Sequence, residues 1–257
     1  MSDLLTLDAL TLRAGERTLC DDLNLKIEQG QRWGVLGRNG AGKTTLLHAL
    51  AGLSPPAQGR VALDGNDLAA LTPRIIAQHI GLLLQDTSDA LPASVLETAL
   101  LGRHPHARGR LFDNAEDLGT ARGALARLGI EHLADRAVAS LSGGERQRLA
   151  LATLLVQAPR LLLLDEPSNH LDVGFQSPLV ALLRSASEED KSAALVMATH
   201  DINLAARLCD FIVLMVRDGE TLIGGAEQIL TSKNLSRAYD CNIAVVEHGG
   251  RKLFYPC

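Results

Sequence analysis

The chain has 257 residues, of which 46% are hydrophobic and 21% are charged, and its formal net charge is −5. This length can form one sizeable core, or a core that carries an inserted lobe. No apolar stretch approaches the roughly 20 residues that a membrane-spanning helix needs. This net negative charge does not indicate the positively charged surface that binds nucleic acid, so we expect no nucleic-acid partner.

The first residues and the cysteines favour a cytosolic, reducing location. The N-terminal segment Met1–Leu12 contains Asp3 and Asp8 and has neither the basic start nor the long apolar run of a secretory signal. The cysteines have no paired short spacing, which argues against a zinc knuckle and a disulfide framework; they are Cys20, Cys209, Cys241 and Cys257. We expect reduced thiols, and any membrane role must come through a partner.

The first part of the chain predicts strands followed by one helix. Residues 1–30 alternate apolar and polar positions and contain Gly15 and Gly30, which indicates two or three antiparallel strands with turns. Trp33–Leu36 is a short apolar strand. A glycine-rich turn follows, and then a helical pattern over Thr44–Ala51 that ends at Gly52.

Later segments predict a largely parallel central sheet and a helical insertion. Continuous apolar runs are typical of strands buried on both faces; they lie at Ile80–Leu84, Leu161–Leu164, Ala194–Ala198 and Phe211–Val216. Between them the pattern is helical, over Ser94–Arg103, Ala115–Leu128 and Glu145–Gln157. We predict a single α/β domain, with a core of residues 1–85 and 158–257 and a helical subdomain of residues 86–157.

The glycine-rich turn matches the phosphate-loop pattern G-x-x-x-x-G-K-S/T between a predicted strand and a predicted helix. Glycines let consecutive backbone N–H groups point at a phosphate, and the helix start adds its partial positive charge. Lys43 is then placed to reach the β- and γ-phosphates of ATP, and the Thr44 hydroxyl to ligate Mg²⁺. The predicted ATP-binding residues here are Gly37, Arg38, Asn39, Gly40, Ala41, Gly42, Lys43, Thr44 and Thr45. The alternative is a glycine-rich turn without a ligand.

Two carboxylates follow the buried run at 161–164, where ligands bind in open α/β sheets. In a nucleotide hydrolase Asp165 holds Mg²⁺, through water, and Glu166 orients or deprotonates the attacking water. The alternative is a helix N-cap in the turn that follows. The phosphate loop elsewhere in the chain favours the catalytic interpretation.

The sequence Leu-Ser-Gly-Gly-Glu-Arg-Gln-Arg at 141–148 resembles the signature motif of the ATP-binding-cassette (ABC) family. Ser142 and Glu145 also form a potential capping box, and a helix start with free N–H groups suits a phosphate from outside the chain. The resemblance implies a P-loop NTPase ABC ATPase fold, with an N-terminal antiparallel β-layer and the inserted helical subdomain. It also implies a head-to-tail homodimer in which one copy caps the ATP of the other, through Ser142, Gly143, Gly144 and Glu145.

Further family landmarks follow in order along the chain. By resemblance, Gln85 is the Q-loop residue that contacts Mg²⁺ and the attacking water, and His200 is the switch histidine that touches the γ-phosphate. The segment Ser168–Asp172 is similar to the D-loop at the dimer interface. One position departs from the pattern, because Ala14 stands where family members usually have an aromatic residue against adenine. Arg13 or Arg17 could replace it through a planar guanidinium.

The segment Leu101–His106 resembles subunits that energise uptake of iron complexes, such as siderophores and haem, and of vitamin B12. This resemblance implies a separate membrane permease, indirectly a substrate-binding protein, and a location on the cytoplasmic face of the inner membrane. The permease groove is expected near apolar residues of the helical subdomain, although such residues are more often core; they are Leu91, Val95, Leu96 and Leu100. Two alternatives stay open: an ABC-family ATPase acting on a cytosolic assembly, and a nucleotide-gated interaction module.

Overall fold

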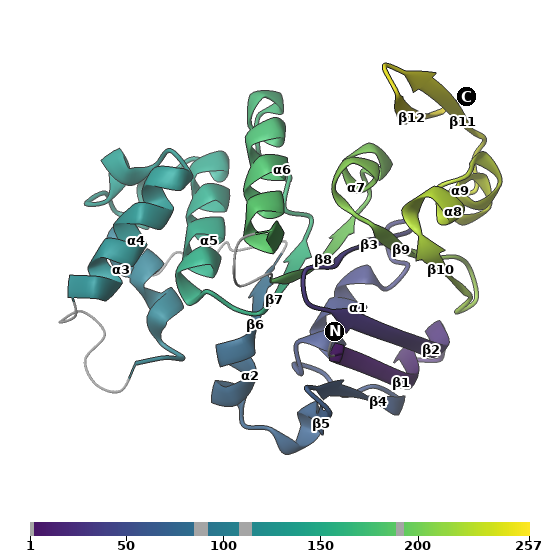
Figure 1. Ribbon diagram of the computed structural model, residues 1–257, viewed down its shortest axis with the longest axis horizontal. Coiled ribbons are helices and arrows are strands. Elements are labelled where there is room, and N and C mark those ends of the chain that lie inside the picture. Colours follow the sequence, from purple (N-terminus) through teal and green to yellow (C-terminus); the bar gives the residue numbers. More distant parts are fainter. Residues whose placement is uncertain (1–2, 85–91, 108–114, 189–192) are drawn as a thin grey trace.

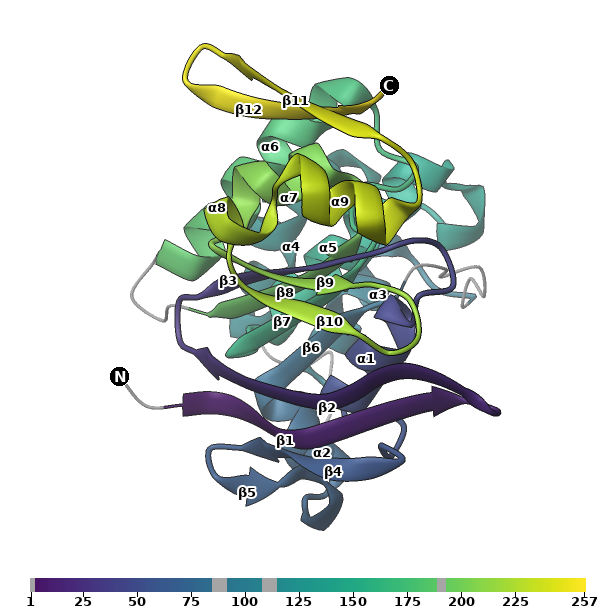
Figure 2. The same ribbon diagram turned by 90° about the vertical axis from the view of Figure 1, so that its right-hand side faces the viewer.

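The computed structural model describes residues 3–84, 92–107, 115–188 and 193–257. Figure 1 shows a central sheet, with antiparallel strands from the N-terminal part on one side of it and most of the helices on the other. The C-terminal residues end in a small hairpin above this arrangement (Figure 2). No helix within these described ranges combines the length and apolar character needed to cross a membrane.

The central sheet has six described strands, in the order β10-β9-β3-β8-β7-β6. Their bounds are β3 (Arg32–Leu36), β6 (Ile80–Leu83), β7 (Leu161–Asp165), β8 (Ala194–Thr199), β9 (Phe211–Met215) and β10 (Thr221–Gly225). Neighbouring strands are parallel, except that β10 pairs antiparallel with β9. The predicted largely parallel sheet is confirmed, and each apolar run agrees with its strand to within one residue.

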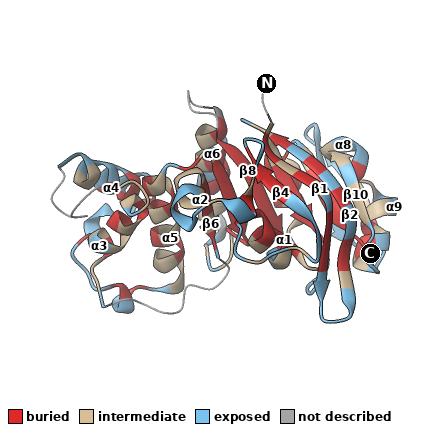
Figure 3. Ribbon diagram, turned by 90° about the horizontal axis from the view of Figure 1, so that it is seen from below, coloured by how far each residue is buried: buried red, intermediate tan, exposed pale blue. Residues whose placement is uncertain are grey.

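Both faces of this sheet are covered, which explains the continuous apolar runs. Leu162 and Leu164 of β7 belong to one hydrophobic cluster, whereas Leu161 and Leu163 belong to a second cluster on the opposite face. Figure 3 shows buried residues concentrated along these strands. A strand between two cores has no position left for an exposed polar side chain, except where it ends.

The N-terminal strands form a separate antiparallel sheet in the order β2-β1-β4-β5. Their bounds are β1 (Asp3–Ala14), β2 (Arg17–Glu28), β4 (Gln58–Leu63) and β5 (Asn66–Asp67). Leu5, Leu7 and Ile27 from this sheet join one hydrophobic cluster with Leu46 and Leu47 of helix α1 (Lys43–Leu50). The predicted β-layer is therefore confirmed, and it covers α1 and one face of the central sheet.

Helices from the middle of the chain lie together on the left of Figure 1. They are α3 (Val95–Leu100), α4 (Ala115–Arg127) and α5 (Gly143–Gln157), accompanied by short 3-10 turns at Leu101–Arg103, Glu131–Leu133 and Val138–Ser140. Helix α2 (Pro73–His79) precedes them, after a 3-10 turn at Leu68–Ala70. α5 begins two residues earlier than predicted, because Gly143 and Gly144 occupy its first turn behind the Ser142 cap.

The apolar residues expected to line a permease groove are mostly part of the core. Val95 is fully buried and Leu100 is 2% exposed, so neither side chain can line an open groove. The expectation is wrong for these two residues, because they pack between α3 and the other helices. Leu96 is half-buried at the edge of the same cluster. Leu91 lies outside the described residues.

The last part of the chain supplies helices against the sheet and a hairpin. Its elements are α6 (Val173–Glu188), α7 (Ile202–Leu208), α8 (Ala226–Ile229), α9 (Ser232–Tyr239), β11 (Ile243–His248) and β12 (Arg251–Pro256). The hairpin is fixed to α7, because the Asn203 side chain exchanges two hydrogen bonds with the backbone of Phe254, at 2.9 and 3.0 Å. In Figure 2, α9 lies beneath this hairpin and above β9 and β10.

Candidate nucleotide site

The predicted phosphate loop connects the end of β3 at Leu36 to the start of α1 at Lys43. Gly37 and Gly42 have φ of 154° and 108°, in the region that L side chains rarely adopt. A Cβ on Gly42 would also lie 2.9 Å from the Leu19 Cβ of strand β2. Only glycine satisfies both constraints, and the resulting curl is the shape that directs backbone N–H groups toward one anion.

The loop residues differ in exposure in a way that suits a bound phosphate. The exposed ones are Arg38, Asn39, Gly40 and Thr44; Gly37, Ala41 and Lys43 are buried, and Gly42 and Thr45 are intermediate. The Lys43 Nζ donates to the carbonyl oxygens of Gly37, at 3.0 Å, and Arg38, at 3.3 Å. Burial lowers the pKa of Lys43, whereas the nearby Glu166 and Asp165 charges raise it. A cation is thus fixed inside the loop.

Thr44 and Asp165 meet although they are 121 positions apart. The Thr44 Oγ1 donates to the Asp165 Oδ2 at 2.6 Å, which joins the first turn of α1 to the end of β7. Burial raises the pKa of Asp165, and the Thr44 hydroxyl opposes this shift. A hydroxyl and a carboxylate beside a phosphate loop are the hard oxygen ligands that Mg²⁺ prefers, so these residues fit the ion.

Glu166 follows directly after β7 and is 4% exposed. Its Oε2 accepts a hydrogen bond from the Thr199 Oγ1 at 3.1 Å and lies 2.9 Å from the His200 Nδ1. The Glu166 backbone has φ of 48° and is held by a hydrogen bond to the Ala198 carbonyl. A non-glycine residue in this conformation carries strain, which occurs most often at functional sites.

These groups converge because they follow neighbouring parallel strands. The order β3-β8-β7 brings the phosphate loop, His200 and the Asp165–Glu166 pair to one edge of the sheet. Thr199 is a member of this group that sequence reasoning missed, although its position directly before His200 could have indicated it. Gln85 follows β6, the next strand along, and lies outside the described residues.

The signature-like segment starts helix α5 at a second location. Ser142 and Glu145 form the predicted capping box: the Ser142 Oγ accepts from the Glu145 N–H at 3.3 Å, and the Ser142 N–H donates to the Glu145 Oε2 at 2.7 Å. These hydrogen bonds with Ser142 lower the pKa of Glu145. The segment borders a pocket of about 410 Å³, lined among others by Ser142, Gly144, Glu145, Arg148, His132 and His170. None of the phosphate-loop residues lines this pocket.

The turn after Glu166 packs directly on this helix start. A Cβ on Gly144 would lie 3.0 Å from the His170 carbonyl oxygen, so a side chain there would displace the turn. The buried Gln147 side chain donates to the Pro167 carbonyl at 3.2 Å. Gln147 was not identified from the sequence, since its partner lies in a different element. The signature-like segment and the acidic strand end are therefore mechanically connected within one chain.

The position of the missing aromatic lies at an exposed hairpin turn. Ala14 pairs with Arg17 and Arg13 pairs with Thr18, at the point where β1 turns into β2. Ala14 and both arginines are exposed. Strand β2 continues from there to Leu19, which touches the phosphate loop at Gly42. Both arginine side chains therefore extend from a hairpin turn that lies next to the phosphate loop.

The Leu101–His106 segment forms a joint between helices. The Gln157 carbonyl lies 3.0 Å from the His106 Nε2, and the Pro105 carbonyl accepts a hydrogen bond from the Gln78 side chain at 2.9 Å. A Cβ on Gly102 would lie 2.3 Å from the Thr153 carbonyl oxygen. Close packing accounts for this glycine, and the segment connects α2 to the end of α5.

Comparisons with known proteins agree with this geometry. The chain is 42% identical over 234 residues to a cobalamin import ATP-binding protein of Halobacterium salinarum, covering 90% of this chain but 57% of that protein. It is 39% identical over 253 residues to a hemin import ATP-binding protein of Pseudomonas entomophila, covering 96% and 97%. The chain thus spans a little over half of the first relative and nearly all of the second.

Solved structures share the fold. A putative metal-chelate type ABC transporter in an inward-facing conformation has a chain that superposes with a TM-score of 0.84 and 28% identity, covering 100% of this chain and 98% of that one. A dimeric ATP-binding cassette in a post-hydrolysis state, bound to ADP and Pi, gives a TM-score of 0.77 at 27% identity and covers 86% and 98%. The sequence model of the ABC transporter family matches residues 20–169. The chain belongs to the ABC transporter family, and its fold is that of the family's ATP-binding cassette.

Proposed function

We propose that this chain is the ATP-hydrolysing subunit of an importer, acting as a homodimer on a separate integral membrane permease. The observation that carries the proposal is the convergence at one sheet edge of a buried lysine, a hydroxyl–carboxylate pair and a second buried carboxylate; these are Lys43, Thr44, Asp165 and Glu166. Phosphoryl transfer needs these groups, because catalysis there consists mainly of positioning and of charge stabilisation.

The phosphate loop binds ATP in this proposal. Residues Gly37–Thr45 surround the β- and γ-phosphates with backbone N–H groups, and Lys43 exchanges its carbonyl partners for phosphate oxygens. Thr44 and Asp165, together with Gln85, would hold Mg²⁺. When bound there, the ion would supply neutralisation of the charge that develops on the phosphoryl oxygens. Lys43 is well prepared for this role, because its ammonium group is already desolvated.

Glu166 is the general base for the attacking water. Its Oε2 is held by Thr199 and His200, so the carboxylate has a fixed direction at the end of β7. His200, whose side chain is 60% exposed, can leave Glu166 and contact the γ-phosphate. This exchange would free a lone pair of Glu166 for the proton of the water.

A second copy completes the site. Ser142, Gly144 and Glu145 border a pocket that no phosphate-loop residue lines. We therefore assign these residues and Gly143 to the ATP held by a partner copy. In a head-to-tail pair, the helix start of α5 approaches the γ-phosphate of the partner's ATP. The solved cassette bound to ADP and Pi is dimeric, which supports the pairing of two copies. An isolated copy should therefore hydrolyse ATP poorly.

The partners and the cargo follow from the relatives. The names of two relatives specify import of cobalamin and hemin, and the solved neighbour is a putative metal-chelate type transporter. We infer that the cargo is an iron complex, such as a siderophore or haem, or vitamin B12. The permease would hold this chain at the cytoplasmic face of the inner membrane, and a substrate-binding protein would deliver the cargo. Residues 86–157 would form the helical subdomain that meets the permease.

Affinity capture tests the transporter assignment separately from the chemistry. A tagged Glu166→Gln chain is expressed in its native cell, membranes are extracted with mild detergent, and the captured proteins are identified with and without ATP. We expect an integral membrane protein with many spanning helices, which can then be reconstituted to test uptake of haem, ferric siderophores and vitamin B12. The tagged chain could instead be recovered only from the soluble fraction, with no membrane protein attached. This result would contradict the importer function but would not contradict the proposed ATP hydrolysis.

A further inference from the structure

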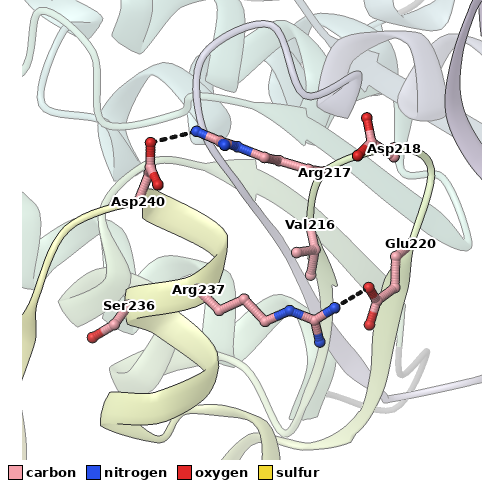
Figure 4. A pocket seen from close by; sticks show the side chains of 7 residues that line it. All are labelled: Val216, Arg217, Asp218, Glu220, Ser236, Arg237 and Asp240. Carbon is pink, nitrogen blue, oxygen red and sulfur yellow. Dashed lines mark hydrogen bonds and ion pairs between the residues drawn. The ribbon is translucent and has the colours of Figure 1, made fainter.

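The C-terminal end of helix α9 touches the phosphate loop across more than 200 residues of sequence. Asp240 directly follows α9, and its Oδ2 accepts a hydrogen bond from the Arg38 Nη1 at 3.3 Å. The same oxygen is bound by the Arg217 guanidinium, which comes from the segment after β9. Figure 4 shows the Arg217–Asp240 ion pair at one end of a pocket of about 430 Å³ between α9 and the turn after β9.

The backbone conformation at position 240 and the adjacent helix end both disfavour an aspartate there. Asp240 adopts the left-handed conformation, with φ of 57° and ψ of 35°, which favours glycine or asparagine at a helix end. A carboxylate at a helix C-terminus also faces the negative end of the helix dipole. Two guanidinium groups compensate for this placement. Residues that break a local rule in this way are often retained for a function.

The two loop residues near this helix end also hold the phosphate-loop lysine. Gly37 packs against β9, because a Cβ on Gly37 would lie 3.0 Å from the Met215 carbonyl oxygen. The carbonyl oxygens of Gly37 and Arg38 accept both observed hydrogen bonds of the Lys43 Nζ. A shift of these two residues would therefore move Lys43, the cation on which phosphate binding depends.

We propose that the end of α9, through Asp240, positions Arg38 and the adjoining Gly37 so that the phosphate loop is preorganised to bind ATP. This inference rests on the proposed function, because it assumes that the loop binds ATP. Asp240 is a positioning residue, since it acts through the loop and not on the reacting atoms. The C-terminal part of the chain thereby becomes a part of the nucleotide site.

The pocket provides a matched control for testing this role. Glu220 lines the same pocket and forms an ion pair with Arg237, as Figure 4 shows, but neither residue contacts the phosphate loop in any described interaction. The Arg38 and Asp240 side chains are 47% and 55% exposed, so the effect of breaking their pair is modest. We expect Asp240→Asn to raise the Kd of ATP about three- to fivefold. Glu220→Gln should leave this Kd within experimental error.

The experiment measures ATP and ADP binding by isothermal titration calorimetry in EDTA, where hydrolysis does not occur, for the wild-type chain, Asp240→Asn and Glu220→Gln. In steady-state hydrolysis with Mg²⁺, Asp240→Asn should raise KM and leave kcat nearly unchanged, and Asp240→Glu should restore part of the affinity.

Three results would overturn the inference. The first is an Asp240→Asn Kd equal to that of the wild-type chain. The second is tighter ATP binding by Asp240→Asn, which would mean that Asp240 merely competes with phosphate for Arg38. The third is an equal loss of affinity in Glu220→Gln, which would indicate a general effect of the pocket. Absence of ATP binding by the wild-type chain would instead contradict the proposed function.

Discussion

Replacing Glu166 by glutamine removes one negative charge from the buried end of β7 and keeps the size of the side chain. The amide oxygen can still accept the hydrogen bond that the Thr199 hydroxyl gives to the carboxylate. The contact with the His200 Nδ1 no longer involves a carboxylate charge. Hydrogen bonds to charged groups contribute about 1.5–3 kcal/mol against about 1 kcal/mol for neutral ones, so each contact loses about 1 kcal/mol.

A second effect opposes this loss. Burial, and to a smaller degree the neighbouring Glu166 charge, raises the pKa of Asp165. Removing the Glu166 charge relieves this repulsion, so the free energy of unfolding should fall by no more than about 2 kcal/mol. Loss of a general base lowers turnover about 10²- to 10⁴-fold, which corresponds to about 3–5 kcal/mol of activation free energy. The effect on catalysis should therefore exceed the effect on stability.

Phosphate release measured under saturating Mg-ATP, together with thermal unfolding, separates the two effects. We expect Glu166→Gln to keep its Tm and its ATP affinity, to turn over at least a hundredfold more slowly, and to accumulate as an ATP-bound dimer in size-exclusion chromatography. Glu220→Gln, a carboxylate outside the site, should hydrolyse at the wild-type rate. Turnover by Glu166→Gln close to that of the wild-type chain would refute the assignment of Glu166 as the base.

Three further perturbations follow from the site. Burial raises the pKa of Asp165, so the ionised Asp165 carboxylate destabilises the nucleotide-free chain at pH values above this folded-state pKa. Asp165→Asn should therefore raise the Tm at pH 7. This increase in Tm should become smaller as the pH falls toward about 3.9, the ordinary pKa of an aspartate. Gly42→Ala should destabilise the chain by more than about 1 kcal/mol in urea unfolding, because φ is 108° and the methyl group meets Leu19. If an arginine replaces the adenine-stacking aromatic, Arg13→Ala or Arg17→Ala should weaken ATP binding by about 0.5–1 kcal/mol, and an unchanged Kd in both would refute the replacement.

The sequence predicted the central sheet well because its strands are buried on both faces. Runs such as 161–164 have no polar position, so their continuous apolar character identified them as strands without knowledge of their neighbours. Helix α6 was not predicted, since Pro178 and several serines interrupt its pattern, and its apolar face becomes evident only against the sheet. The hairpin β11–β12 was also missed, because one face of it is exposed and its register depends on contacts with α7.

The sequence predicted those parts of the site whose functional residues are adjacent along the chain. The phosphate loop and the acidic strand end are contiguous, and the parallel order of β3, β8 and β7 brings them together. Thr199 and Gln147 act through single hydrogen bonds to other elements, and a single threonine or glutamine has no local signature. The Arg38–Asp240 contact joins residues 202 positions apart, so only the folded chain reveals it.

The most direct test of the account asks whether two copies share each ATP site. A Lys43→Met chain keeps its signature-like segment, and a Ser142→Asp chain keeps its phosphate loop and, because aspartate also caps helices, its α5 start. Each variant alone should hydrolyse almost no ATP. Lys43→Met lacks the cation of the phosphate loop, and the added carboxylate of Ser142→Asp repels the partner's phosphate. An equal mixture should recover about a quarter of the wild-type rate, because half of the dimers are mixed and each mixed dimer has one intact site. No recovery in the mixture, or full activity of Ser142→Asp alone, would contradict the shared site.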